Sequence, residues 1–248
     1  MNQIKEKLRY QSFPLGIYLL LLATIAVFLG ATQGSVSPSH LLNIARTAAP
    51  LGIAAMGQTI VLVAGGLDLS VGATMSMVNL IAASVMNGDV NRIAPAVAIS
   101  LALCLVIGLV NGIMITKFKM QPFLVTMAMG IIIQGGYYLY TQGIARGSIA
   151  DEMRFISSGW IGDIPVAVII WIVIWIFLSL ILKKTIYGRK LYLTGANPSA
   201  SRLSGFHADW ITISAYVVCA FLPRLAGLML SAYIAVASGD IALDYTLN

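Results

Sequence analysis

Seven apolar stretches follow one another along this chain, each close to the roughly 20 residues that a helix needs to cross a lipid bilayer. The composition agrees, because 59% of the 248 residues are hydrophobic and only 10% are charged. A water-soluble domain carries about 25% charged residues, so this chain has too few charges to cover a water-exposed surface. We therefore predict an all-α polytopic membrane protein, a single domain over residues 1–248. Its seven or so transmembrane helices are expected near Pro14–Ala31, Ile44–Ala64, Ser70–Met86, Ile93–Ile115, Pro122–Thr141, Val166–Leu182 and Ile211–Ala235.

The positions of the basic residues predict which side of the membrane each loop faces. Only Arg92, Arg146 and Arg154 fall in outside loops if the N-terminus is cytoplasmic. The basic residues of the inside segments are then Lys5, Lys7, Arg9, Lys117, Lys119, Lys183, Lys184, Arg189, Lys190 and Arg202. This asymmetry obeys the positive-inside rule, so it predicts a cytoplasmic N-terminus. It also accounts for the formal net charge of +6 without a nucleic-acid partner.

The segment between the second and third stretches, residues 64–72, carries the first motif with chemistry in it. Gly65 and Gly66 permit a broken helix near Gly65–Asp68, which a membrane protein tolerates where the backbone is buried in protein or lines a cavity. Asp68 and Ser70 are then placed to offer hydrogen bonds to the hydroxyl groups of a polar substrate. The alternative is that Asp68 caps the third helix by accepting its free N–H groups.

Other polar residues inside the apolar stretches are candidates to line a substrate path. They are Gln58, Asn79, Asn111 and Thr126, although polar residues within spans also serve simply to bridge helices. Secondary transport coupled to ions would need Asp68 as its coupling carboxylate.

Catalysis and metal binding are not predicted for this chain. Cys104 and Cys219 lie inside apolar stretches, and His40 and His207 stand alone in loops. The sequence also lacks a glycine-rich loop followed by Lys and Ser or Thr, so it has no P-loop for ATP.

The inside segment from Lys183 to Asp209 contains the second motif, which predicts a short helix near Asn197–Ser204. Asn197 suits the N-cap, Pro198 suits the first helical position, and Gly205 can end the helix. So short a helix is not stable alone in water and must dock against something. It is either a coupling helix that seats in a cytoplasmic ATPase or a short turn that lies on its own bundle.

At these two motifs the sequence resembles the permease subunits of bacterial ABC importers for ribose, xylose and related monosaccharides, a family that also includes autoinducer-2 permeases. Gly65–Gly72 meets the Gly-Gly-Leu-Asp-Leu-Ser-Val-Gly signature, Gly57–Thr59 precedes it as in the family, and Pro122–Thr126 matches the start of the fifth span. The resemblance runs from about Ser37 to the last residue. In the ATPase-coupling segment the matching residues are Gly188, Arg189, Gly195, Asn197, Ala200, Ser204 and Gly205.

The resemblance implies a multi-pass protein of the bacterial inner (cytoplasmic) membrane that moves a monosaccharide and is not itself an enzyme. It implies a cytoplasmic ATP-binding subunit that binds and hydrolyses ATP, so no cofactor is expected on this chain. It also implies a second permease, identical or different, and a periplasmic sugar-binding protein. For the substrate path we expect Gln58, Gly65, Gly66, Asp68, Ser70, Asn79 and Thr126.

Two departures from the family support an alternative, a truncated permease that does not transport. Members of the family are longer, and their final helices are missing here. Pro223 and Arg224 stand in the middle of the last span, where the family has small residues. A proline removes a hydrogen bond from the helix ladder, and a central arginine in lipid costs roughly 2.5 kcal/mol or more. Arg224 either pairs with an acid in a partner chain or marks a degenerate or truncated permease.

Overall fold

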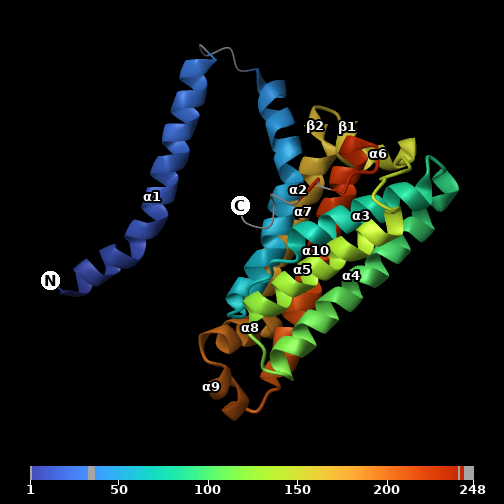
Figure 1. Cartoon of the computed structure of the whole chain (residues 1–248). Coiled ribbons are helices and arrows are strands. Elements are labelled where there is room, and N and C mark those ends of the chain that lie inside the picture. The colour runs from blue at the N-terminus through green and yellow to red at the C-terminus, as the bar shows by residue number, and fades with distance from the viewer. Residues whose placement is uncertain (1, 33–36, 240, 243–248) are drawn as a thin grey trace. The chain divides into compact units, whose positions relative to one another are not determined.

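The computed structural model describes the backbone of residues 2–32, 37–239 and 241–242, and the side chains of these residues from residue 15 onward (Figure 1). The described residues are mostly helical, and they include one 3-10 turn, η1, and one short β-hairpin. The elements are α1 (Asn2–Ala31), α2 (Pro38–Val63), α3 (Val71–Met86), η1 (Val90–Arg92), α4 (Ile93–Thr116), α5 (Pro122–Thr141), α6 (Asp151–Ser158), β1 (Trp160–Ile161), β2 (Ile164–Pro165), α7 (Val166–Lys184), α8 (Ile186–Ala196), α9 (Pro198–Leu203) and α10 (Ala208–Ile234).

The all-α membrane fold is confirmed, because a helix covers each of the seven apolar stretches. Among the described residues, five helices have the length and composition to cross a membrane. Two shorter apolar helices, Leu15–Ala31 and Val71–Met86, accompany them. A count of seven spans therefore stays a prediction. The five longer helices are Pro38–Val63, Val90–Thr116, Pro122–Thr141, Val166–Lys184 and Ala208–Ile234.

The chain forms two compact units, Met1–Ile44 and Ala45–Asn248. In the first unit the rings of Phe28 and His40 stack with their centroids 6.1 Å apart. The second unit holds the packed core and every feature described below. Its large apolar side chains point outward as well as inward. Ile132 on α5 and Phe177 on α7 are each 65% exposed, which suits a surface that faces lipid.

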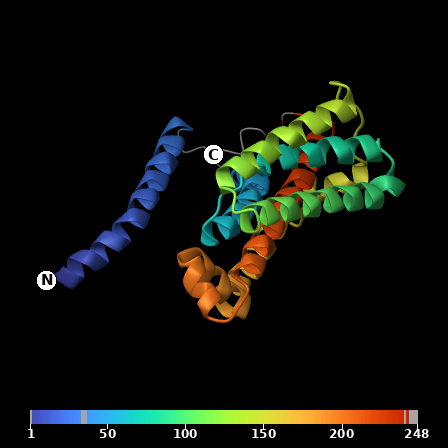
Figure 2. The ribbon, with the colours of Figure 1, turned by 60° about the horizontal axis from the view of Figure 1, so that its bottom comes forward.

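Within the second unit, α10 packs against both α3 and α4, while α3, α4 and α5 run side by side (Figures 1 and 2). Small residues allow this close approach, as they do in membrane bundles generally. A Cβ atom on Gly112 of α4 would lie 2.8 Å from the Cα of Ile213 of α10. One on Gly108 would lie 2.7 Å from the carbonyl oxygen of Tyr216. Glycine at these positions therefore sets the spacing of the two helices.

The two ends of this bundle, called the α9 end and the α6 end, carry different elements. The α9 end carries α8, α9, the turn between α4 and α5, and residues 64–70 (Figure 1). The α6 end carries α6, the β-hairpin, and residues 87–92, 142–150 and 235–238 (Figure 1). The basic segments around Lys117 and Arg202, predicted to face the cytoplasm, meet at the α9 end. That the α9 end faces the cytoplasm remains a prediction from charge.

The two unusual residues of the last span are accommodated inside the bundle. Pro223 lies within α10, which continues unbroken to Ile234, so the lost ladder bond does not end the helix. A Cβ on Gly57 of α2 would come within 3.2 Å of both Pro223 and the carbonyl oxygen of Cys219. Arg224 is 3% exposed and donates from Nη2 to the carbonyl oxygen of Val97 on α4, at 2.7 Å. Its Nη2 thus has a backbone partner within the chain, while its Nε is buried without a hydrogen bond among the described residues, so an acidic partner from another chain stays a prediction.

Candidate functional site

The loop between α2 and α3, residues 64–70, forms the predicted helix break. The helical ladder of α2 ends at Val63, and Gly65 follows with a φ of +82°, a conformation that glycine adopts without strain. Gly66 donates its N–H to the carbonyl oxygen of Val61, at 2.9 Å. A side chain on Gly66 would overlap the hydroxyl of Tyr216. The two glycines therefore serve different needs, backbone conformation at Gly65 and close approach at Gly66.

Asp68 is 2% exposed and directs its carboxylate at the start of α3. Its Oδ1 accepts the backbone N–H of Ser70 at 2.8 Å and also the Ser70 hydroxyl. Ser70 is itself the N-cap of α3 and makes no side-chain cap bond. The capping interpretation therefore holds in a modified form. Asp68 fixes the residue that precedes the helix rather than the free N–H groups of its first turn.

Three neighbouring helices hold this loop through side-chain hydrogen bonds, and Thr126 makes two of them. Asn111 of α4 donates to the Ser70 hydroxyl at 3.3 Å. Thr126 of α5 accepts the N–H of Leu69 at 3.1 Å, and Tyr216 of α10 donates to a carbonyl oxygen of the loop at 3.4 Å. In the part of the chain that the structure describes, Asn111 Oδ1 is buried without a hydrogen bond. Asn111 thus joins the polar cluster around Asp68.

A cavity of about 410 Å³ lies on the α9-end side of this loop. Gly65, Gly66 and Tyr216 form part of its wall, together with Thr194 of α8 and Thr212 of α10. Asp68, Ser70 and Thr126 are not among the residues that line it, and each is almost fully buried. The structure therefore brings five of the predicted path residues together, two on the cavity wall and three in the polar cluster beside it.

Gln58 and Asn79, the other two predicted path residues, lie elsewhere. Gln58 is half-buried on α2, with its Oε1 3.9 Å from the sulfur of Cys219. Asn79 bonds at the α6 end, donating to the carbonyl oxygen of Val236 at 3.2 Å and accepting the N–H of Ser238 at 2.7 Å. Asn79 thus ties α3 to the segment that follows α10, and its place in the substrate path stays a prediction.

The predicted short helix is present as α9, and its ends follow the expected residues. Asn197 is the N-cap and accepts the N–H of Ala200 at 3.0 Å, Pro198 is the first helical residue, and Gly205 follows with a φ of +81°. Ser201 is buried, whereas Leu203 is 90% exposed. The helix thus rests on the bundle along one side and presents an apolar side chain on the other.

The helix α8, which precedes α9, was not predicted from the sequence. Thr185 is its N-cap and accepts the N–H of Gly188 at 3.2 Å, and this threonine is the local signal that marks the start of the helix. A side chain on Gly188 would overlap the carbonyl oxygen of Leu182, while Arg189 is exposed. The hydroxyl of Tyr187 lies 3.0 Å from that of Ser214 on α10. Burial raises the pKa of Tyr187, so the phenol stays protonated.

Gly195, in the last turn of α8, touches the loop that carries Asp68. A Cβ atom on Gly195 would overlap the carbonyl oxygen of Val63, and one on Gly65 would lie 3.4 Å from the carbonyl oxygen of Gly195. The two backbones are therefore in direct contact with no side chain between them. The two motifs, separate in the sequence, meet here.

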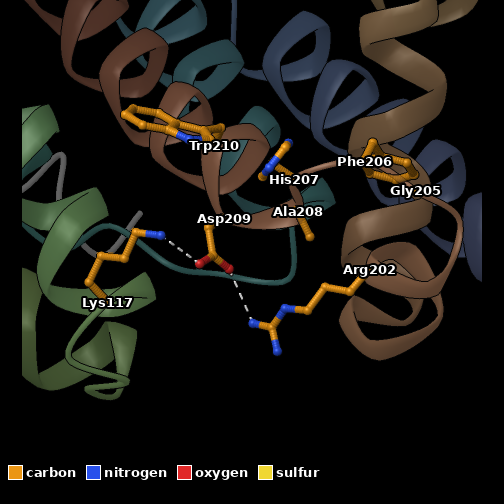
Figure 3. Close-up of a pocket in the computed structure, with 8 residues that line it drawn as sticks. All are labelled: Lys117, Arg202, Gly205, Phe206, His207, Ala208, Asp209 and Trp210. Carbon is orange, nitrogen blue, oxygen red and sulfur yellow. Dashed lines mark hydrogen bonds and ion pairs between the residues drawn. The ribbon is translucent and has the colours of Figure 1, made fainter.

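Asp209, which the sequence analysis did not single out, joins three elements at the α9 end (Figure 3). Its carboxylate accepts Lys117 Nζ at 2.9 Å and Arg202 Nη2 at 3.1 Å. Lys117 caps α4, Arg202 lies on α9, and Asp209 is in the first turn of α10. Because Asp209 is the only acidic residue between positions 164 and 239, its isolation among cations was the available sequence signal. Together these residues line a pocket of about 270 Å³ with Gly205, Phe206, His207, Ala208 and Trp210.

Comparison with known proteins finds one family over most of the chain. Residues 40–248 match the family described as "Branched-chain amino acid transport system / permease component". The ribose import permease protein of Escherichia coli strain K12 is 32% identical over 92% of this chain and 72% of its own length. The ribose import permease protein of Bacillus subtilis strain 168 is 30% identical over 94% and 73%.

A fructose import permease protein from Bifidobacterium longum is 30% identical over 81% of this chain and 57% of its own length. The comparison found no matching solved structure.

Proposed function

This chain belongs to that family of permease components, and from this premise we propose that it forms the path for a monosaccharide through an ATP-driven importer. It is a multi-pass protein of the inner membrane and a transport component rather than an enzyme. The observation that carries the substrate class is the similarity, over more than four fifths of the chain, to relatives named for ribose and for fructose.

The cavity beside residues 64–70 suits a small polar solute. Its volume of about 410 Å³ falls within the range of small-molecule sites, roughly 300–1,000 Å³. Thr194, Thr212 and Tyr216 line it beside glycines 65 and 66, and the hydroxyl group of each donates to a backbone carbonyl oxygen. We take Asp68, Ser70 and Thr126 as the polar residues that a sugar meets when the loop moves. Hydroxyl groups of a sugar need such paired donors and acceptors.

The partners follow from the same proposal. A cytoplasmic ATP-binding subunit binds and hydrolyses ATP. This subunit binds the permease at α9, where Leu203 of the permease is exposed. A second permease, identical or different, completes the path, and a periplasmic sugar-binding protein delivers the solute. No cofactor is bound by this chain itself.

The test is affinity purification of the chain from gently solubilised membranes, scored for a co-purifying ATP-binding subunit. The purified complex, supplied with its binding protein, should hydrolyse ATP faster when ribose or fructose is present. Absence of the ATP-binding subunit from folded, membrane-inserted protein would overturn the proposal. Uptake that stops with an uncoupler while ATP persists would instead favour a transporter driven by an ion gradient.

A further inference from the structure

The coupling segment and the path loop share one point of direct backbone contact, at Gly195. The carbonyl oxygen of Val63 occupies the space that a side chain on Gly195 would need, and Ala64 is also within 3.1 Å of that position. Gly65 approaches the same residue from the other side. Backbone has no rotamers with which to absorb a displacement, so a movement of α8 toward residues 63–65 at this point is passed on to them.

The loop is built to respond to such a displacement. Its bonds to Asn111 and Tyr216 are 3.3 and 3.4 Å long, which is longer than the ordinary range, and its bond to Thr126 is 3.1 Å long, within that range. Gly65, with its positive φ, lies next to the point of contact. A single push can therefore change several of these bonds at once, because all of them hold one short segment.

The helix that carries Gly195 is also joined to α9. Asn197 follows Gly195 by two residues and caps α9 with a 3.0 Å bond to Ala200. Arg202 of α9 is in turn bonded to Asp209. Any force that a partner applies to α9 thus reaches Gly195 through a short, hydrogen-bonded stretch of chain.

We propose that Gly195 is a positioning residue that transmits movement of α9 to residues 64–70, and that this loop is the part of the path that the ATP-binding subunit opens and closes. The proposal rests on the proposed function, since it needs that partner. The sequence placed Gly195 in the segment that contacts the ATP-binding subunit, whereas in the structure Gly195 packs against residues 63–65 of its own bundle. A glycine present only for close packing is the competing explanation.

The first experiment uses Gly195→Ala in the complete complex with its ATP-binding subunit. We expect the subunit still to co-purify, while sugar uptake into proteoliposomes falls at least tenfold and hydrolysis no longer responds to sugar. Uptake is measured with whichever of ribose and fructose stimulates the wild-type complex. Gly135→Ala is the matched control, because Gly135 is also helical and nothing lies within 4 Å of a Cβ there. Loss of the subunit from Gly195→Ala, or unchanged uptake, would overturn the proposal.

The second experiment needs no variant and does not depend on whether Gly195→Ala folds. Amide hydrogen exchange is measured on the wild-type complex with and without a non-hydrolysable ATP analogue. We expect residues 64–70 and 195–203 to change together, with residues 79–86 of α3 unchanged. A response at 195–203 alone would refute the link. Sugar-dependent ATP hydrolysis by the wild-type complex tests the proposed function. Amide exchange in residues 64–70 tests the present inference.

Discussion

The two ends of the bundle are closed by different kinds of bond. At the α6 end, backbone pairs with backbone. Ile149 donates to Ala235 at 2.9 Å, Ala237 donates to Gly147 at 3.2 Å, and Gly88 donates to Ser148 at 3.0 Å. The amide of Asn79 adds two more bonds to the same backbone. At the α9 end, the loop of residues 64–70 is held to α4, α5 and α10 by side chains, and one exposed ion pair, between Arg202 and Asp209, ties α9 to α10.

This difference indicates which end is able to rearrange. A backbone pair that opens where it is buried, as at Ile149, leaves unsatisfied groups at a cost of about 1–3 kcal/mol each, whereas the exposed Gly88 can bond to water instead. An exposed ion pair contributes only about 0–1 kcal/mol, and a side chain can turn to a new partner. We therefore expect the α6 end to be the fixed end of the bundle. At the α9 end, we expect the exposed ion pair of α9 to move at small cost, whereas the buried polar cluster around Asp68 costs more to open.

The largest effect is expected at the fixed end, for Gly147→Ala. Gly147 has a φ of +106°, and a side chain there would overlap the carbonyl oxygen of Ala83. We expect a loss of at least about 2 kcal/mol or a failure to fold, seen as a lower midpoint of thermal unfolding in detergent. Gly143→Ala is the control, because its φ is +75° but nothing lies within 4 Å. Equal effects of the two variants would show that backbone strain alone matters.

Asn79→Ala comes next, because it removes both bonds that join α3 to residues 236–238. The Asn79 side chain is fully buried, whereas Val236 is 51% exposed and Ser238 is half-buried, so water reaches part of the backbone that the variant frees. We expect a loss of about 2 kcal/mol in the free energy of unfolding. Sugar uptake should fall only in proportion to the folded fraction. A selective loss of uptake in fully folded protein would return Asn79 to the substrate path.

At the movable end, Thr126→Val should cost less and act locally. The variant keeps the shape of the side chain but no longer accepts the N–H of Leu69. We expect about 1 kcal/mol of destabilisation, with faster amide exchange in residues 64–70 and unchanged exchange at Ile149 and Ala237. Faster exchange at both ends would contradict the division between fixed and movable ends.

The features that the sequence predicted are those set by local rules. The break at Gly65 follows from paired glycines, and α9 follows from Asn197, Pro198 and Gly205, which act within a few residues of one another. The partner of Arg224 is a backbone carbonyl 127 positions away, which no residue pattern announces. The contact of Gly195 with Val63 is equally non-local, because a glycine at the end of a helix also suits a simple turn. Tertiary packing, and not composition, decides the partner of Arg224 and the contact of Gly195.

The smallest effect is expected for Asp209→Asn, which weakens both ion pairs of the α9 end. The side chains of Lys117 and Arg202 are 51% and 58% exposed, so solvent screens their attraction to Asp209. We expect a loss of no more than about 1 kcal/mol in low salt. The difference from wild type should vanish in about 1 M salt, where the screening length is roughly 3 Å. Asp151→Asn, which weakens the exposed pair with Arg154 at the α6 end, is the matched control for stability. Sugar uptake separates the two variants, because Asp209, unlike Asp151, bonds to α9, through Arg202. A drop in uptake for Asp209→Asn but not for Asp151→Asn would place the movable contacts at the α9 end, whereas equal drops would remove the distinction.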